Sequence, residues 1–148
     1  MRAFEVRENA HPSKITLSLN APIPIPGPDE VLVDVYSAGL NFFDVRCSLA
    51  VINLYVSYHT QILQAQGKYQ VKPPFPFVLG AEFAGRIAPD SPIPEGCTYN
   101  VGDRVFGSVQ GCYADKVVSN WKQLLPLPKG MTFDDGAGPC CVRFVYNE

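Results

Sequence analysis

Three polar residues in the first half of the chain, Asn41, Asp44 and Tyr69, have side chains that could orient a small reacting molecule. An asparagine amide both donates and accepts hydrogen bonds, and an ionised aspartate accepts them. A tyrosine hydroxyl can donate to an oxygen on which negative charge develops. The alternatives are structural: Asn41 and Asp44 could cap a turn, and Tyr69 could pack over the edge of a barrel. The residues alone favour the turn, so the candidate site depends on what surrounds it.

The elements that must hold these residues are predicted to be strands. Alternation is clearest in 30–39, where Val31, Val33 and Val35 point to one face of the strand. Several short strands with turn chemistry, and no long helical period, favour a mainly antiparallel, partly closed barrel. The other predicted strands are 1–6, 14–19, 81–88, 111–120 and a short one within 122–130.

Prolines and glycines mark the connections between these strands. Prolines at every second position from 22 to 28 exclude a central strand and predict an extended connector. A second proline-limited extended loop is expected at 71–80. A hairpin-like turn is expected at Gly102–Asp103, and Gly67 is interpreted as a turn residue.

Composition argues against several partners. Twelve basic and 14 acidic residues give a net charge of −2, without the block of like charges that nucleic acids or anionic membranes attract. The start of the chain lacks the apolar core of a secretory signal, and no apolar run reaches the roughly 20 residues that a membrane helix needs. We therefore expect a cytoplasmic protein that binds neither nucleic acid nor membrane.

A metal site is not expected either. The five cysteines are odd in number, irregularly spaced and without a C-x-x-C pair, so they are interpreted as reduced thiols. The two histidines, His11 and His59, lie near no cysteine pair and are interpreted as loop residues.

The end of the chain starts a helix and then interrupts it. Thr132 and Asp135 form a capping-box pattern, but Gly136, Gly138 and Pro139 follow at once. The stretch "GAGPCC", 136–141, is the nearest approach to the G-x-G-x-x-G of a dinucleotide site. It lacks the third glycine and has proline where the helix should begin. The chain is therefore predicted to hold no complete dinucleotide site.

The order and spacing of five motifs resemble the amino-terminal half of zinc-free quinone oxidoreductases, which are similar to zeta-crystallin and belong to the medium-chain dehydrogenase/reductase superfamily. Singly these motifs are weak signals, and their order makes the signal strong. They are "PGPDEVLVDVYSAGLNFFD", "GKYQ…PPFPFVLGAEFAGRI", "VGDRVFG", "GCYADKVV" and "LLPLPKGMTFDDGAG".

The resemblance implies a GroES-like, partly open barrel of the alcohol dehydrogenase amino-terminal type. In the family a Rossmann half binds NADPH, and hydride passes to a quinone or an activated alkene. Residues matching Asn41 and Asp44 line the nicotinamide and substrate cleft, and a tyrosine matching Tyr69 faces the pocket in some members. Zinc-dependent relatives have a cysteine at Asn41 and a histidine at Ala81, which argues against zinc. Glu82 could be a cleft carboxylate or the structural partner of a buried arginine, and the structural interpretation is favoured.

Measured against the family, residues 45–61 are interpreted as an insertion, because their removal restores the spacing between Asp44 and Tyr69. Valine codons begin with GT and one glutamine codon ends with AG, which are the usual first and last bases of an intron. Because the run begins with Val45 and ends with Gln61, our hypothesis is a retained intron. A genuine lid or membrane-touching loop is the alternative. We expect a GroES-like domain at 1–135 and a divergent, truncated tail at 136–148, with the Rossmann half absent.

An incomplete NADPH-dependent quinone or enone reductase is thus the leading prediction, and the 148 residues alone should not turn over. Its expected partner is a small-molecule quinone or enone. The alternative is a non-catalytic barrel, acting as an interaction module that associates with a full-length relative, or an inert mis-spliced fragment.

Overall fold

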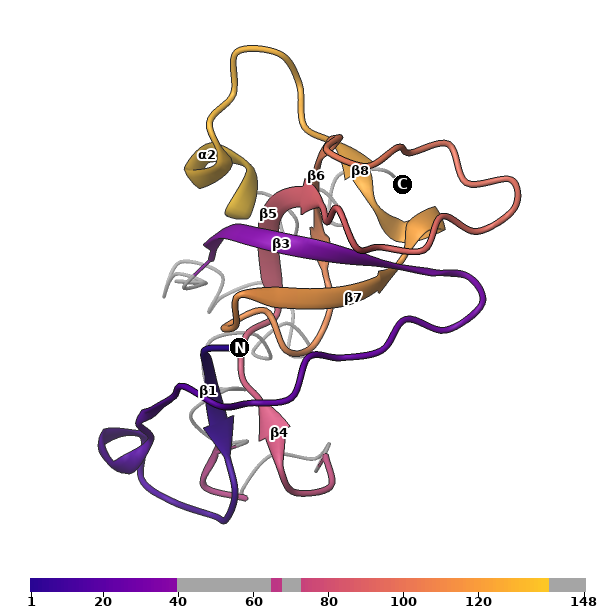
Figure 1. The fold of residues 1–148 in the computed structure, drawn as a ribbon. Helices are drawn as coiled ribbons and strands as arrows, with labels where there is room; N and C mark the ends of the chain where they lie inside the picture. Colours follow the sequence, from indigo (N-terminus) through magenta and orange to yellow (C-terminus); the bar gives the residue numbers. More distant parts are fainter. Residues whose placement is uncertain (40–64, 68–72, 139–148) are drawn as a thin grey trace, which may run out of the picture.

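The computed structural model describes residues 1–39, 65–67 and 73–138, and strands account for most of its regular structure (Figure 1). The order of elements is β1 (Ala3–Val6), η1 (Pro12–Lys14), β2 (Leu17–Ser18), β3 (Glu30–Ala38), β4 (Phe77–Val78), β5 (Glu82–Ile87), β6 (Arg104–Ser108), β7 (Lys116–Asn120), η3 (Trp121–Gln123), β8 (Leu125–Pro126) and α2 (Phe133–Ala137).

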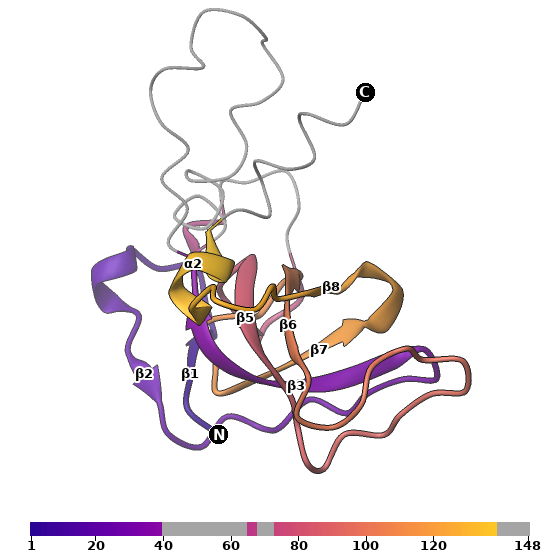
Figure 2. The ribbon, with the colours of Figure 1, turned by 90° about the horizontal axis from the view of Figure 1, so that it is seen from above.

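The strands form two antiparallel sheets. The larger has the order β7-β3-β5-β6-β8, and the smaller has the order β2-β1-β4. An isolated bridge between Ala3 and Ala114 connects the smaller sheet to the chain just before β7. Among the described residues, β7 and β8 are the outer strands of the larger sheet, so this sheet does not close on itself (Figures 1 and 2). The prediction of a mainly β, partly open barrel is confirmed.

Strand alternation builds the main core. Val31 and Val33 of β3 are fully buried and Val35 packs against the same cluster, as the pattern predicted. Phe83 and Ile87 of β5 face the same side, because side chains two residues apart share a face. The buried members of this first cluster are Val31, Val33, Phe83, Ile87, Val105, Cys112, Val117 and Leu124.

Two of the predicted connections differ from the structure. The 71–80 loop contains β4, a two-residue strand that pairs with β1 through Glu5–Val78 and Val6–Phe77. At Gly102 the turn is present, with φ at 86°, but β6 pairs with β5 and not with the residues just before the turn. Prolines 92 and 94 keep that preceding segment out of the sheet. Within the described residues, no helix combines the length and apolar character needed to cross a membrane.

Strand β3 has a β-bulge at Tyr36. The register of β3 against β5 shifts between Val35 and Ser37, so Tyr36 is the extra residue, and it is 61% exposed. Gly85 of β5 pairs with Val35 opposite the bulge. Because Gly85 has no side chain, the backbone of Asp34 can lie close to it. Tyr36 thus lies on the outer face, as alternation from the partly buried Val35 predicts, and it is the unpaired residue of the bulge.

The short helix α2 lies on that outer face, in contact with β3, β5 and β6 (Figure 2). The predicted capping box is present: the Thr132 hydroxyl accepts from the Asp135 N–H, and the Asp135 carboxylate accepts from the Thr132 N–H at 2.8 Å. The hydrogen bond that the Thr132 hydroxyl donates to the Asp135 carboxylate, and after it the bond from the Thr132 N–H, lower the pKa of Asp135. Gly136 packs against Leu127 and Ala84, so its missing side chain allows the helix to approach the sheet closely. The helix ends after five residues.

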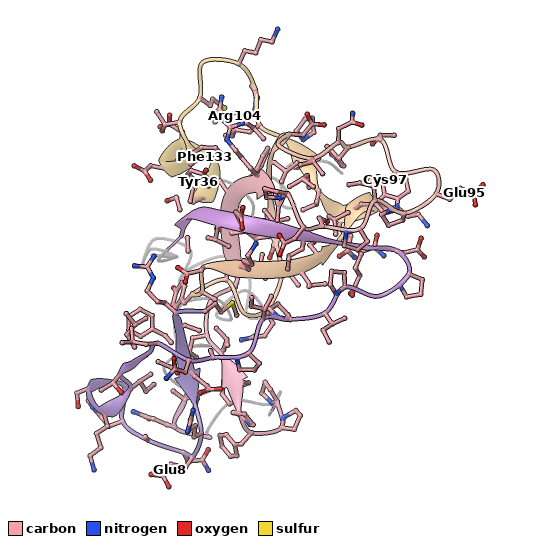
Figure 3. The ribbon with its side chains drawn as sticks, in the orientation of Figure 1. Glu8, Tyr36, Glu95, Cys97, Arg104 and Phe133 are labelled. Atoms are coloured by element: carbon pink, nitrogen blue, oxygen red, sulfur yellow. The ribbon has the colours of Figure 1, made fainter. Side chains whose placement is uncertain are left out.

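Phe133 anchors the start of α2. Its ring stacks on Tyr36 at a centroid distance of 4.6 Å, and the guanidinium carbons of Arg104 and Arg86 lie 4.8 and 5.6 Å from its centroid (Figure 3). Arg104 also donates to the Met131 carbonyl and Arg86 to the Gly102 carbonyl at 2.8 Å, so both cations are held in place. The Phe133 ring, in contact with Tyr36 and both arginines, thus holds the start of α2 on the sheet.

Removing the ring should detach this helix. We expect Phe133→Ala to lower the free energy of unfolding by about 1–2 kcal/mol, through lost aromatic and cation–π contacts. Chemical denaturation measures the loss, and limited proteolysis after residue 130 reports the release of the helix. Phe75→Ala, at an exposed ring on a loop, is the control. Equal effects of the two substitutions would contradict the anchoring role.

Candidate functional site

The three predicted site residues, Asn41, Asp44 and Tyr69, lie outside the described residues, as does the 45–61 run. Their roles stay predictions. The tail 139–148 is also outside, and the limits at 1–135 and 136–148 stay predictions. What the structure does describe is the chain that leads to each part of the predicted site: Gly39, two residues before Asn41, and Gly67, two residues before Tyr69.

Gly39 is held by hydrogen bonds to both its N–H and its carbonyl oxygen. Its N–H donates to the Glu82 carbonyl at 3.1 Å. The Tyr113 hydroxyl donates to its carbonyl oxygen at 3.2 Å. The chain that continues toward Asn41 therefore leaves β3 from a position fixed by β5 and by the segment before β7.

The second approach is held by the amino-terminal loop. The Ala10 N–H donates to the carbonyl of Ala65, which is fully buried, at 2.9 Å. Gly67 has φ at 67° and touches Asn9 so closely that a Cβ would lie 2.4 Å from the Asn9 Oδ1. Both observations confirm Gly67 as a turn residue that only glycine fits comfortably.

Gly80 and Ala81 bring the start of β5 against the same region. Gly80 has φ at 101°, and a Cβ on it would lie 2.5 Å from the Tyr113 nitrogen. The Ala81 carbonyl accepts from the Val109 N–H at 2.9 Å and from the Ser108 hydroxyl at 2.8 Å. In the described ranges, no three His, Cys, Asp or Glu side chains gather in a way that could hold a metal ion. Cys97 is a free thiol.

Glu82 is the most unusual polar residue of the region. It is fully buried, and among the residues that the structure describes neither carboxylate oxygen finds a hydrogen-bond partner. Alternation along β5 puts it on the outer face with Ala84 and Arg86. Arg86 and Arg104 donate to backbone carbonyls elsewhere, so no arginine of the described residues fills the structural role that the sequence favoured for Glu82.

A cavity of about 370 Å³ opens beside the end of β3. Its mouth carries the ion pair of Arg2 and Asp115, with Nη2 and Oδ1 2.8 Å apart. Hydrogen bonding from Arg2 lowers the pKa of Asp115, so the carboxylate is ionised at neutral pH. The walls offer apolar contact to a flat ring; they include Phe4, Leu17, Val35, Tyr36, Ala38 and Tyr113.

Sequence reasoning missed Tyr113 and the cavity. Tyr113 lies in "GCYADKVV", which was interpreted only as a strand, and its contact with Gly39 spans 74 positions. A half-buried tyrosine beside a glycine and a cysteine carries no local sign of such a distant partner.

Comparison with known proteins places this geometry in a family. The alcohol dehydrogenase GroES-like domain family matches residues 27–129. Quinone oxidoreductase-like protein 2 of Mus musculus is 34% identical over 124 residues, which cover 83% of this chain and 30% of that protein.

Two solved structures have the same fold over 93% of this chain. A probable oxidoreductase from Mycobacterium abscessus superposes with a TM-score of 0.71 at 28% identity, over 38% of its own chain. The quinone oxidoreductase from Thermus thermophilus, solved also in complex with NADPH, superposes with a TM-score of 0.62 at 25% identity, over 35% of its chain. The chain thus spans about a third of the length of these relatives. It belongs to the alcohol dehydrogenase GroES-like domain family and is similar to the amino-terminal part of quinone oxidoreductases.

Proposed function

We propose that these residues form the substrate-side domain of an NADPH-dependent reductase that acts on quinones or activated alkenes. The observation that carries the proposal is the family match over 27–129 together with relatives named as quinone oxidoreductases. The anchored end of β3 at Gly39 supports it, because this is the point from which the chain continues to Asn41 and Asp44.

Within this proposal, each candidate residue has a stated task. Asn41 and Asp44 orient the nicotinamide carboxamide and the substrate by donating and accepting hydrogen bonds. Tyr69 donates to the substrate oxygen that gains negative charge during reduction. The apolar residues that line the cavity beside β3, among them Phe4 and Tyr36, offer contact to a flat substrate ring.

Within the proposal, the nucleotide phosphates bind elsewhere than at 136–138, the described part of the stretch 136–141. The only sequence approach to a phosphate loop begins at Gly136, and this glycine lies inside α2 with its α-carbon against Leu127 and Ala84. A phosphate loop would instead need glycines ahead of a helix, with free N–H groups aimed at the ligand. NADPH supplies the hydride in the proposed reaction, and a part of a longer protein would hold its phosphates.

The test joins residues 1–138 to the carboxyl-terminal remainder of the Thermus thermophilus quinone oxidoreductase. We expect the fused protein to oxidise NADPH in the presence of 1,4-naphthoquinone, and the 148-residue chain to give no rate above the no-enzyme control. Asn41→Ala in the fused protein should lower kcat about 100-fold, the order of loss expected when the reacting groups are misplaced by about 1 Å.

Asn20→Ala is the matched control, since Asn20 is exposed and far along the chain from the predicted site. A fused protein whose rate is insensitive to Asn41→Ala, or a turnover by the 148 residues alone, would overturn the proposed roles.

A further inference from the structure

We propose that Tyr113 is the positioning residue that fixes both approaches to the predicted cleft, at Gly39 and at Ala65. The inference rests on the proposed function and deepens it. Tyr113 lies between the cavity and the core, contributes to the cavity wall, and belongs to neither the predicted site residues nor a regular strand.

The hydroxyl end of Tyr113 holds the first approach. It donates to the Gly39 carbonyl at 3.2 Å, and the Gly39 N–H is bonded to the Glu82 carbonyl at 3.1 Å. These two bonds hold the two different peptide groups that flank the Gly39 α-carbon, so rotation about both backbone bonds of Gly39 is restricted. Among the described residues, loss of the Tyr113 hydroxyl would leave Gly39 with the bond from its N–H to Glu82.

The ring of Tyr113 holds the second approach. It packs against a further buried cluster, which consists of Val6, Ala65, Phe77 and Leu79. Ala65 has no exposed surface and accepts the hydrogen bond of Ala10. One side chain thus bonds to the end of β3 and packs on the cluster from which the chain continues to Gly67.

The backbone of Tyr113 is itself fixed, which a positioning residue requires. Its N–H donates to the Leu79 carbonyl at 2.8 Å, and its carbonyl accepts from the Phe4 N–H at 2.9 Å. Gly80 allows this approach, because a Cβ there would lie 2.6 Å from the Tyr113 Cδ1. Strand β1 and Leu79, the residue after β4, therefore hold the backbone of Tyr113, and Gly80 leaves room for its ring.

Hydrogen exchange in the 148-residue chain tests the proposal, with the Gly39 N–H and the Ala10 N–H as reporters of the two approaches. Tyr113→Phe keeps the ring and loses the hydroxyl, so exchange at Gly39 should quicken about fivefold while Ala10 is unchanged. Tyr113→Ala should quicken both. If the Ala10 N–H exchanges at the unsubstituted rate in Tyr113→Phe but faster in Tyr113→Ala, the ring and not the hydroxyl protects it.

Tyr99→Phe is the matched control. Tyr99 is also a half-buried tyrosine packed against a buried cluster, and its hydroxyl donates to the Leu124 carbonyl at 2.8 Å. It should leave both reporters unchanged. Unchanged exchange at Gly39 in Tyr113→Phe, or an equal effect of Tyr99→Phe, would overturn the proposal.

A kinetic arm uses the fused protein described above. Tyr113→Phe should lower kcat several-fold with KM little changed, because orientation and not substrate contact is lost. A rise in KM with kcat intact would contradict a positioning role. If the fused protein is inactive, the proposed function fails while the exchange result still decides the role of Tyr113.

Discussion

Replacing Gly85 with alanine should destabilise the chain by about 3 kcal/mol or more, because the added methyl group meets backbone atoms. A Cβ at Gly85 would lie 2.1 Å from the Asp34 carbonyl oxygen and 3.0 Å from the Asp34 carbonyl carbon. β5 lies between β3 and β6 in the sheet, so neither strand can move without breaking its other pairing. Relief requires separating β3 from β5 at the bulge.

Urea denaturation measures this effect. Trp121, the single tryptophan, packs against the first cluster and gives a fluorescence signal for loss of the core. The control is Gly138→Ala, since Gly138 has φ at −101° and an added Cβ there meets nothing within 4 Å. Equal denaturation midpoints for the two variants would show that the strands tolerate a side chain at Gly85.

The same substitution should also disturb the outer face. The shift in register next to Gly85 makes Tyr36 the extra residue, and Tyr36 stacks on Phe133 at the start of α2. Separation of β3 from β5 at the bulge would therefore move the ring on which Phe133 stacks. Gly85→Ala should therefore expose α2 to proteolysis at lower urea concentrations than those that unfold the core.

Local sequence patterns predicted the longest strands but missed β4 and made the strands predicted at 14–19 and 111–120 too long, since β2 is Leu17–Ser18 and β7 is Lys116–Asn120. Alternating valines in 30–39 predicted the buried face of β3, because the two-residue period depends only on neighbouring positions. The capping box at Thr132 was predicted for the same reason, since its bonds span three residues. The matched motifs then predicted the family.

Long-range contacts were beyond the sequence. The bulge at Tyr36 depends on Gly85, a residue of a different strand, and the bond from Tyr113 to Gly39 spans 74 positions. Nothing near either residue marks its partner. The candidate site was predicted from the family resemblance, and Asn41, Asp44 and Tyr69 remain predictions that kinetics must test.

Glu82 is buried, but the described residues around it give its carboxylate no hydrogen bond. A buried carboxylate without hydrogen bonds costs folding free energy, since it loses its water and gains no partner. Residues that break local folding rules in this way are expected where a function is served. The carboxylate lies at the start of β5 next to Gly39, whose N–H its own backbone carbonyl binds. Stability measurements can therefore separate its two interpretations, as a cleft carboxylate or as the partner of a buried cation.

Glu82→Met should raise the free energy of unfolding by about 1–3 kcal/mol, because an apolar side chain of similar length needs no partner in a buried position. Glu82→Gln should raise it less, since a buried amide still lacks hydrogen bonds. Glu30→Gln is the matched control and should lower the free energy of unfolding. The Glu30 carboxylate accepts a hydrogen bond from the Gly27 N–H at 2.8 Å, and the substitution weakens that bond. Urea denaturation at neutral pH compares the three variants. A loss of stability in both Glu82 variants would mean that a cation within this chain already pairs with the carboxylate. A gain would mean that the carboxylate destabilises the fold, as is expected of a carboxylate that serves in the cleft.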